Sequence, residues 1–296
     1  MDPVFLIFAS LGVFVFGLSK GGVPGPIAML AVPVMSFAMS PLQAAGILLP
    51  LLIIMDFSAI YLYWKKWINK ILKIIIPASI IGILFGTFTF KYTNEDQIRI
   101  MVGFISIIFV LVSFIQKSNF LLKPTKIKGY FWSSIAGYTS FLIHAGNPPI
   151  NFYVLPLKLE KISFIGTMTL AFLVINLVKI IPYYYVGLLA PSNLMVSLLL
   201  LPLAFISVLI GYFIQKKIPE KLFFNIVYIL LFLSGFLGRL FHVLFPITIA
   251  LLLSPLVILE KCFRSSGSYQ GMELSIPIPL LLSTATITLK FIIIIK

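Results

Sequence analysis

The chain contains 296 residues, of which 60% are hydrophobic and 10% are charged, whereas soluble domains contain about 45–50% apolar and about 25% charged residues. This composition excludes a separate soluble domain and predicts an integral membrane protein. A formal net charge of +14 would suggest nucleic-acid binding in a soluble protein, but here the lysines cluster in short connections between apolar segments, as in cytoplasmic loops. We therefore expect a lipid bilayer around the chain and no nucleic-acid partner.

Apolar segments that approach the roughly 20 residues needed to cross a bilayer recur along the chain. In chain order we predict segments at 3–19 with 26–38, 42–64, 71–90, 96–116, 129–145 with 148–157, 162–189, 194–214 and 221–241. Two of these elements are broken by glycine, proline and polar residues, the first by KGGVPG and the second by HAGNPP. The sequence thus predicts one transmembrane domain over 1–242, followed by a hydrophobic extension over 243–296 of undefined structure.

An internal repeat relates the two halves of this domain, 1–118 and 119–242. Gly22 and Pro24 recur as Gly146 and Pro148 after 124 residues, and later punctuating residues recur after 125. The alternative is that these residues recur by chance, because apolar sequences align readily with one another. We predict an all-α polytopic membrane protein built from two such repeats.

The basic residues predict the orientation of the segments. Loops at 65–73, 117–128 and 216–221 are rich in lysine and are expected in the cytoplasm, whereas loops at 91–99 and 190–193 are expected outside. Each broken element must then begin and end on one side, as a re-entrant hairpin. Every repeat contains one hairpin and three crossings, an odd number, so the repeats are inverted, as in many transporters.

The breaks indicate a cavity, because irregular backbone at membrane depth must be buried in protein or line water. Proline suits the first position of a helix, so we expect a half-helix to resume after each break. The free N–H groups and the positive dipole ends of these half-helices would attract an anion. In addition to these backbone groups, the predicted site includes side chains near both breaks and in segment 162–189. The predicted substrate-binding residues are Lys20, Gly21, Gly22, Pro24, His144, Gly146, Asn147, Pro148, Thr167, Asn176 and Lys179.

Several of these side chains have a second interpretation. Lys20 is a candidate anion ligand, but it could instead end the first helix and extend its amine to the membrane interface. His144 could donate to an oxyanion or serve as a structural donor. Lys179 shares a helix face with Asn176 and either lines the pathway or extends past the tyrosines at 183–185. Asp56 could pair with a buried lysine or carry a coupling proton, and we favour pairing.

At these residues the chain resembles the sulfite exporter TauE/SafE family. The resemblance rests on GLSKGGVPGP and AVPVMSFAMSPLQAAG in the first half, and on SFLIHAGNPPINFYVLP, FIGTMTLAFLVINLVK and YYYVG in the second. It covers about 1–242 and implies movement of sulfite, sulfonates or related small anions across the cytoplasmic membrane, often as export. The departures are Lys20 before the glycine pair, Ala145-Gly146-Asn147 in place of a richer glycine run, and the tail from Val243.

The favoured function is therefore a secondary transporter for small inorganic or organic anions in the cell membrane, with no cofactor. An anion channel is the alternative and would show neither saturation nor exchange. A membrane-embedded enzyme would need clustered catalytic or metal-binding side chains, whereas the chain has two histidines, one cysteine and eight scattered acidic residues. We predict no catalytic residue and no metal site, and homo-oligomerisation is left open.

Overall fold

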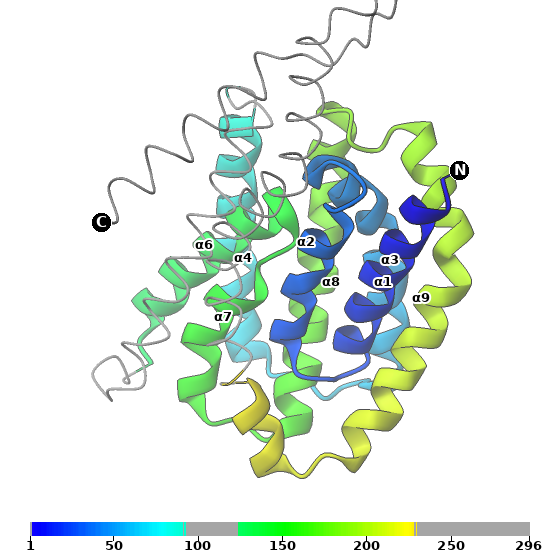
Figure 1. The fold of residues 1–296 in the computed structure, drawn as a ribbon. Helices are drawn as coiled ribbons and strands as arrows, with labels where there is room; N and C mark the ends of the chain where they lie inside the picture. Colours follow the sequence, from blue (N-terminus) through cyan, green and yellow to red (C-terminus); the bar gives the residue numbers. More distant parts are fainter. Residues whose placement is uncertain (1, 91, 93–123, 228, 230–296) are drawn as a thin grey trace, which may run out of the picture. The chain divides into compact units, whose positions relative to one another are not determined.

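A computed structural model of the chain describes residues 2–90, 92, 124–227 and 229. These residues belong to one compact unit, Met1–Phe236, and every regular element among them is a helix. Within these described residues, five helices are long and apolar enough to cross a bilayer (Figure 1): α1 (Pro3–Lys20), α3 (Pro41–Leu62), α4 (Asn69–Phe90), α8 (Lys161–Tyr185) and α9 (Pro191–Lys217). The prediction of an all-α polytopic membrane protein is confirmed to this extent.

Both predicted breaks are present, and the chain reverses direction at each. After α1 it continues as the 3₁₀-helix η1 (Gly25–Leu30) and the short α2 (Ala31–Met35), which pack back against α1 (Figure 1). In the same way α6 (Lys126–Ile143) is followed by α7 (Asn147–Val154), which packs against it, and by the 3₁₀ turn η2 (Leu155–Leu157). The first turn lies beside the C-terminal end of α3, where the Tyr63 hydroxyl donates to the Gly21 carbonyl at 2.6 Å.

The prediction of a single half-helix over 26–38 is wrong. The structure has six residues of 3₁₀-helix followed by only five residues of α-helix. Pro24, Pro26 and Pro33 have no backbone N–H and cannot complete an α-helical ladder. A short 3₁₀ segment tolerates this composition better, so the first return segment differs from α7, which is α-helical.

Close helix contacts at small residues join elements from the two halves of the sequence. α4 packs against α6, and α1 packs against α9. At the first contact, the positions where Gly82 and Gly137 would carry side chains are occupied by the backbone of the partner helix. Small residues at such contacts let membrane helices approach closely. Close van der Waals packing matters there because the hydrophobic effect does not drive helices together within lipid.

α3 and α8 form the centre of the described unit. They pack against each other, and each also contacts one of the outer pairs, α3 with α9 and α8 with α4. Their buried faces carry the polar side chains of Asp56, Asn176 and Lys179 within an otherwise apolar interior. The helices that form the core therefore also supply the polar groups of the site.

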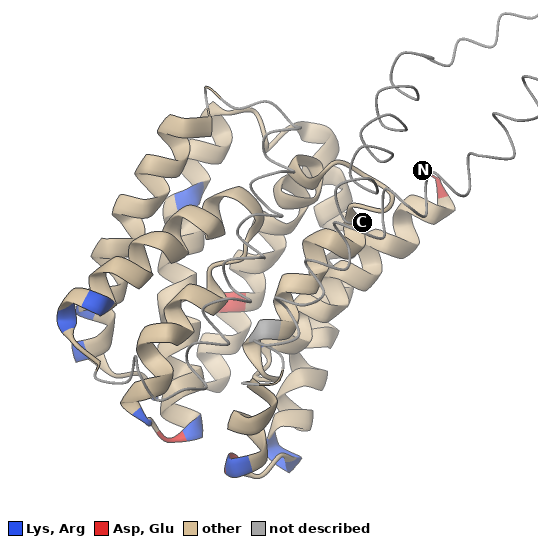
Figure 2. Ribbon diagram, turned by 60° about the vertical axis from the view of Figure 1, so that its left-hand side comes forward, with Lys and Arg blue, Asp and Glu red and all other residues tan. Residues whose placement is uncertain are grey.

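Most of the described basic residues, other than the buried Lys20 and Lys179, gather at one end of the helices, the lower end in Figure 2. α8 begins there with Lys161, and α9 ends there with Lys216 and Lys217. This clustering agrees with the predicted basic loops on a common side.

Five predictions fall wholly or mostly on residues outside the described part: the segment 96–116, the loop 91–99 apart from Tyr92, the loop 117–128 up to residue 123, most of the segment 221–241, and the tail 243–296. The segment that was predicted to start at 221 is helical over 220–227.

Candidate functional site

The turn after α1 uses its backbone donors internally. Gly22 has a φ of 107°, and its N–H donates to the Ser19 carbonyl while that of Val23 donates to Leu18, both at 3.1 Å. This pair of bonds is the Schellman pattern that ends many helices at a glycine. The N–H of Gly21 donates to Gly17 at 2.9 Å. The expectation that the N–H groups of Gly21 and Gly22 hold the anion is therefore wrong, because the helix end itself satisfies them.

The return segments also offer few backbone donors. Proline has no N–H, and both segments begin in proline-rich sequence, VPGP at the first break and NPP at the second. Pro24 is buried and its carbonyl accepts from Ile27 at 3.2 Å, while Pro148 is buried at the second position of α7. The predicted dipole-based site is thus reduced at both breaks, and side chains must supply most donors.

Replacing Gly22 by valine is expected to destabilise the fold, because of the backbone conformation at this position and the contact with Tyr63. A positive φ costs about 1–3 kcal/mol for a side chain that does not favour it, and the new Cβ would collide with the Tyr63 hydroxyl. Gly187 has a φ of 77° with nothing within 4 Å, so Gly187→Val isolates the backbone cost. Thermal unfolding should show the larger loss for Gly22→Val, and equal losses would contradict a packing constraint at this turn.

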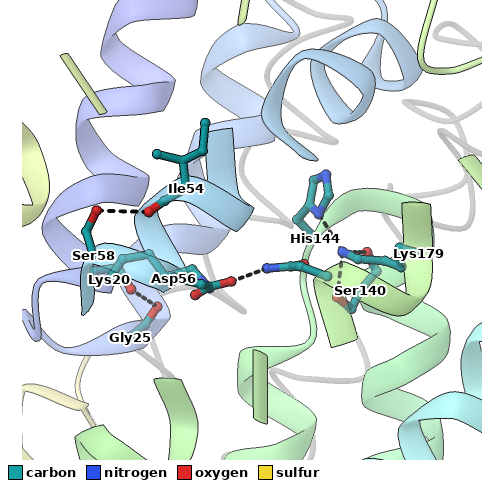
Figure 3. A network of polar contacts seen from close by, with 10 residues as sticks. Lys20, Gly25, Ile54, Asp56, Ser58, Ser140, His144 and Lys179 are labelled. Atoms are coloured by element: carbon teal, nitrogen blue, oxygen red, sulfur yellow. Dashed lines mark hydrogen bonds and ion pairs between the residues drawn. The ribbon is translucent and has the colours of Figure 1, made fainter. Parts of the chain in front are cut away.

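Lys20 forms an ion pair inside the helical unit. Its ammonium lies 2.5 Å from Oδ1 of Asp56, and Nδ2 of Asn176 donates to Oδ2 of the same carboxylate at 2.6 Å (Figure 3). Asp56 is fully buried and the Lys20 side chain is only 10% exposed. The prediction that Asp56 pairs with a lysine is confirmed. α1 does end at Lys20, but the alternative that its amine reaches the interface is wrong.

A second polar cluster surrounds Lys179 on the neighbouring side of the site (Figure 3). Its Nζ lies 3.1 Å from both the carbonyl and the hydroxyl oxygen of Ser140 and 2.8 Å from Nδ1 of His144. Nε2 of His144 lies 3.0 Å from the Ala45 carbonyl; because a carbonyl only accepts, Nε2 carries the hydrogen and Nδ1 accepts from Lys179. Lys179 is fully buried, so the interpretation that it extends past the tyrosines is wrong.

A pocket lies between these polar groups and an apolar wall. Phe16, Phe164, Phe172 and Phe223 contribute rings to the wall. The principal polar lining residues come from both halves of the chain: Lys20, Ser140, His144, Asn147, Thr169 and Asn176. A mostly apolar pocket with a few converging polar groups is the usual form of a small-ligand site.

The two breaks meet at this pocket. Gly25 and Asn147 both line it, and a Cβ on Gly25 would lie within 2.3 Å of Nδ2 of Asn147. Asn151 donates to Oδ1 of Asn147 at 2.6 Å, which fixes the amide and leaves its NH₂ group on the side of Gly25. The pocket therefore lies where we expected an anion to be flanked by both breaks.

The structure separates the predicted site residues into two groups. Five of them line the pocket: Lys20, Gly22, His144, Asn147 and Asn176. The other six are not among its lining residues: Gly21, Pro24, Gly146, Pro148, Thr167 and Lys179. Gly146 lies against Ala136 and Ser140 of α6 and allows α7 to pack closely there.

Thr169, and not Thr167, is the threonine that α8 presents to the pocket, beside Asn176. Thr167 instead accepts from the Ile68 N–H at 3.0 Å and donates to the Ser163 carbonyl at 2.7 Å, which anchors the loop between α3 and α4. Helical geometry could have shown this: seven residues separate Thr169 from Asn176, about two turns, whereas nine place Thr167 on the opposite face. Helical spacing could not have predicted Ser140 in the same way, because α6 contacts the pocket only through its C-terminal end.

The model of the sulfite exporter TauE/SafE family matches residues 9–237. The chain belongs to the sulfite exporter TauE/SafE family. The match includes both breaks, α1 from Ala9 onward, and α3, α4, α8 and α9 in full, and the prediction from the glycine and proline motifs is confirmed. Comparisons with curated proteins and with solved structures gave no match.

Membership of the TauE/SafE family, together with five apolar helices, identifies a multi-pass membrane transporter of sulfite or related anions. Within the described residues of this TauE/SafE protein no group of three His, Cys, Asp or Glu side chains could hold a metal ion. Its pocket region instead contains two lysines and one carboxylate. One basic side chain, Lys179, is therefore in excess.

Proposed function

We propose that this TauE/SafE protein is a secondary carrier that moves small anions such as sulfite or sulfonates across the cell membrane. The observation that carries the proposal is the pocket at the junction of the two breaks. Lys20, Asn147 and Asn176 line one small space beside an apolar wall, and each of these side chains carries N–H donors. A sulfite or sulfonate group has three acceptor oxygens and suits such a set of donors, while the methyl end of a sulfonate suits the phenylalanine rings.

The charges around the pocket favour an anion over a cation. The carboxylate of Asp56 is matched by Lys20, so the remaining basic group is Lys179 with its partner His144. In an interior of low dielectric constant one unmatched basic group has a large influence on which ion can enter. A basic group can gain a positive charge beside an anion but never a negative charge beside Na⁺ or K⁺, so this composition supports an anionic substrate.

The helix contacts support two inverted repeats. α4 and α9 occupy corresponding positions in the two halves of the sequence, and so do α6 and α1. α4 packs on α6 while α9 packs on α1, so each contact has a counterpart with the halves exchanged. In transporters of this plan, one repeat moves against the other around a central site, and the pocket lies where the two broken elements meet.

The basic end of the helices supports a cytoplasmic position for the loops predicted at 65–73 and 216–221 and for the described part, 124–128, of the loop predicted at 117–128 (Figure 2). The breaks then enter from opposite sides of the membrane. This arrangement gives the pocket one broken element facing each compartment, which is what alternating access requires.

Exchange in proteoliposomes distinguishes a carrier from a channel. Vesicles containing the purified protein and unlabelled sulfite or methanesulfonate should take up external labelled anion with saturating kinetics, and internal anion should accelerate this uptake. Linear flux that internal anion does not accelerate would support the channel instead. Empty vesicles control for leakage of the undissociated acid.

Replacing Asn147 by alanine in this assay should raise the half-saturating concentration about tenfold, since one hydrogen bond contributes about 0.5–1.5 kcal/mol or somewhat more to a charged partner. Asn225 is exposed and does not line the pocket, so Asn225→Ala is the matched control and should leave the value unchanged. Equal half-saturation in wild type and Asn147→Ala would remove Asn147 from the site.

A further inference from the structure

Lys179 and His144, here called the basic pair, are not needed for the binding contacts proposed above. The ammonium of Lys179 is fully buried, and its partners are the two oxygens of Ser140 and Nδ1 of His144 (Figure 3). None of these partners is a carboxylate, in contrast to Lys20, which pairs with Asp56. The basic pair is therefore a buried base with no counter-charge in contact.

A buried cation without a counter-charge is costly, and such a group tends to lose its proton. Lys179 and His144 share one short contact of 2.8 Å between two nitrogens, so a proton bound there is held by both side chains. Ser140 and His144 also line the pocket. An anion in the pocket thus lies next to the partners of Lys179 and supplies the charge that the empty site lacks.

We infer that the basic pair takes up one proton when an anion enters the pocket and releases it when the anion leaves, so that the carrier moves anion and proton together. This inference rests on the proposed function. In the uptake step a hydronium ion gives its proton to a nitrogen lone pair, an N–H bond forms and water remains. Release reverses the step, and nothing is oxidised or reduced.

The other titratable groups around the basic pair are already matched or lie at helix ends. Lys20 and Asp56 neutralise each other, and the hydroxyl of Tyr183, whose ring lies 5.9 Å from Lys179, donates to the Phe141 carbonyl at 2.6 Å. Titratable residues on α4, α6 and α9 lie within two turns of a helix end: Lys70, Lys73, Lys126, Lys128, Tyr130, Tyr138, Tyr212, Lys216 and Lys217. Among them, the ring of Tyr138 packs against Phe85. The basic pair is the remaining proton acceptor beside the pocket among the described residues.

Coupling of this kind makes the movement of a monovalent anion electrically neutral. The anion and the proton enter together, so the total charge of the site does not change. Net uptake by the wild type should then acidify the receiving compartment and should not respond to an imposed membrane potential. A variant without the proton acceptor should carry charge, and a tenfold potassium gradient with valinomycin should change its accumulation ratio about tenfold.

Calorimetry of anion binding tests the inference on the purified full-length protein. Methanesulfonate is the first probe because its charge does not change with pH, and sulfite at mildly acidic pH is the second. Titrations in two buffers with different ionisation enthalpies give the number of protons taken up per anion, and we expect about one. Where the free pair is unprotonated and the bound pair is protonated, affinity should fall about tenfold for each unit of rising pH.

Lys179→Met should bind the anion more weakly, with almost no proton uptake and no dependence on pH. It should still fold, because the substitution removes a buried base and leaves no unpaired carboxylate. Lys217 is exposed at the end of α9, and Lys217→Met should behave as the wild type.

Anion binding by the wild type without proton uptake would overturn the inference and leave the proposed function intact. Undiminished proton uptake in Lys179→Met would also overturn it, because another group would then carry the proton. If neither anion binds to the wild type nor exchanges in vesicles, the proposed function fails and this inference fails with it.

Discussion

Lys20→Met is expected to prevent stable folding of the protein, whereas the double variant Lys20→Met/Asp56→Asn is expected to fold and to transport nothing. The single change leaves the fully buried carboxylate of Asp56 without its cation, with Asn176 as the remaining donor. Breaking a buried pair in this way costs about 3–5 kcal/mol, a large part of a typical folding free energy of about 5–15 kcal/mol.

The double variant removes the charge as well as its partner, while an amide at position 56 can still accept from Asn176. Most of the lost stability should return, because a neutral replacement of a buried pair is often harmless. Size-exclusion profiles and thermal unfolding in detergent measure the first effect, and exchange in vesicles measures the second. A Lys20→Met protein as stable as the wild type would show that the ion pair is not formed in the membrane.

Gly25→Leu is expected to abolish exchange, by a factor of one hundred or more, while the protein remains folded. Gly25 lines the pocket, and any side chain there meets the amide of Asn147. The leucine must either fill the space between the breaks or push Asn147 into it, and both outcomes exclude the substrate. Gly25→Leu should lower the maximal exchange rate as well as the affinity for the anion.

A second substitution separates this cause from general damage. In Gly25→Leu/Asn147→Ala the amide is absent and the leucine gains room, so exchange should rise toward the level of Asn147→Ala alone. Neighbouring residues commonly show such non-additive effects. If the double variant is as inactive as Gly25→Leu, the contact between the two breaks does not control access to the pocket.

The helices of this TauE/SafE protein follow from its sequence more closely than the site does. The predicted segments 42–64 and 71–90 agree with α3 and α4 to within two residues at each end, because long apolar runs bounded by prolines or polar residues define spanning helices well. The return after the first break was predicted as one half-helix, yet it is mainly 3₁₀, since three prolines remove the donors that an α-helix needs.

The site was predicted in its location but not in its chemistry. The lysine, histidine and asparagines were found because polar groups inside a membrane are rare and attract attention. The partnership of Lys20 with Asp56 joins residues 36 positions apart, and that of Lys179 with Ser140 joins residues 39 apart. Such contacts depend on helix rotation and depth, which the order of residues does not specify, so backbone donors were expected where side chains lie.

The most direct test of the central claim is anomalous diffraction from crystals of the protein grown with selenite, the heavier analogue of sulfite. The prediction is a selenium peak in the pocket, within hydrogen-bonding distance of Lys20, Asn147 and Asn176. A selenium site elsewhere in the helical unit, or an empty pocket in a protein shown to exchange selenite, would contradict the claim that the two breaks form the anion site.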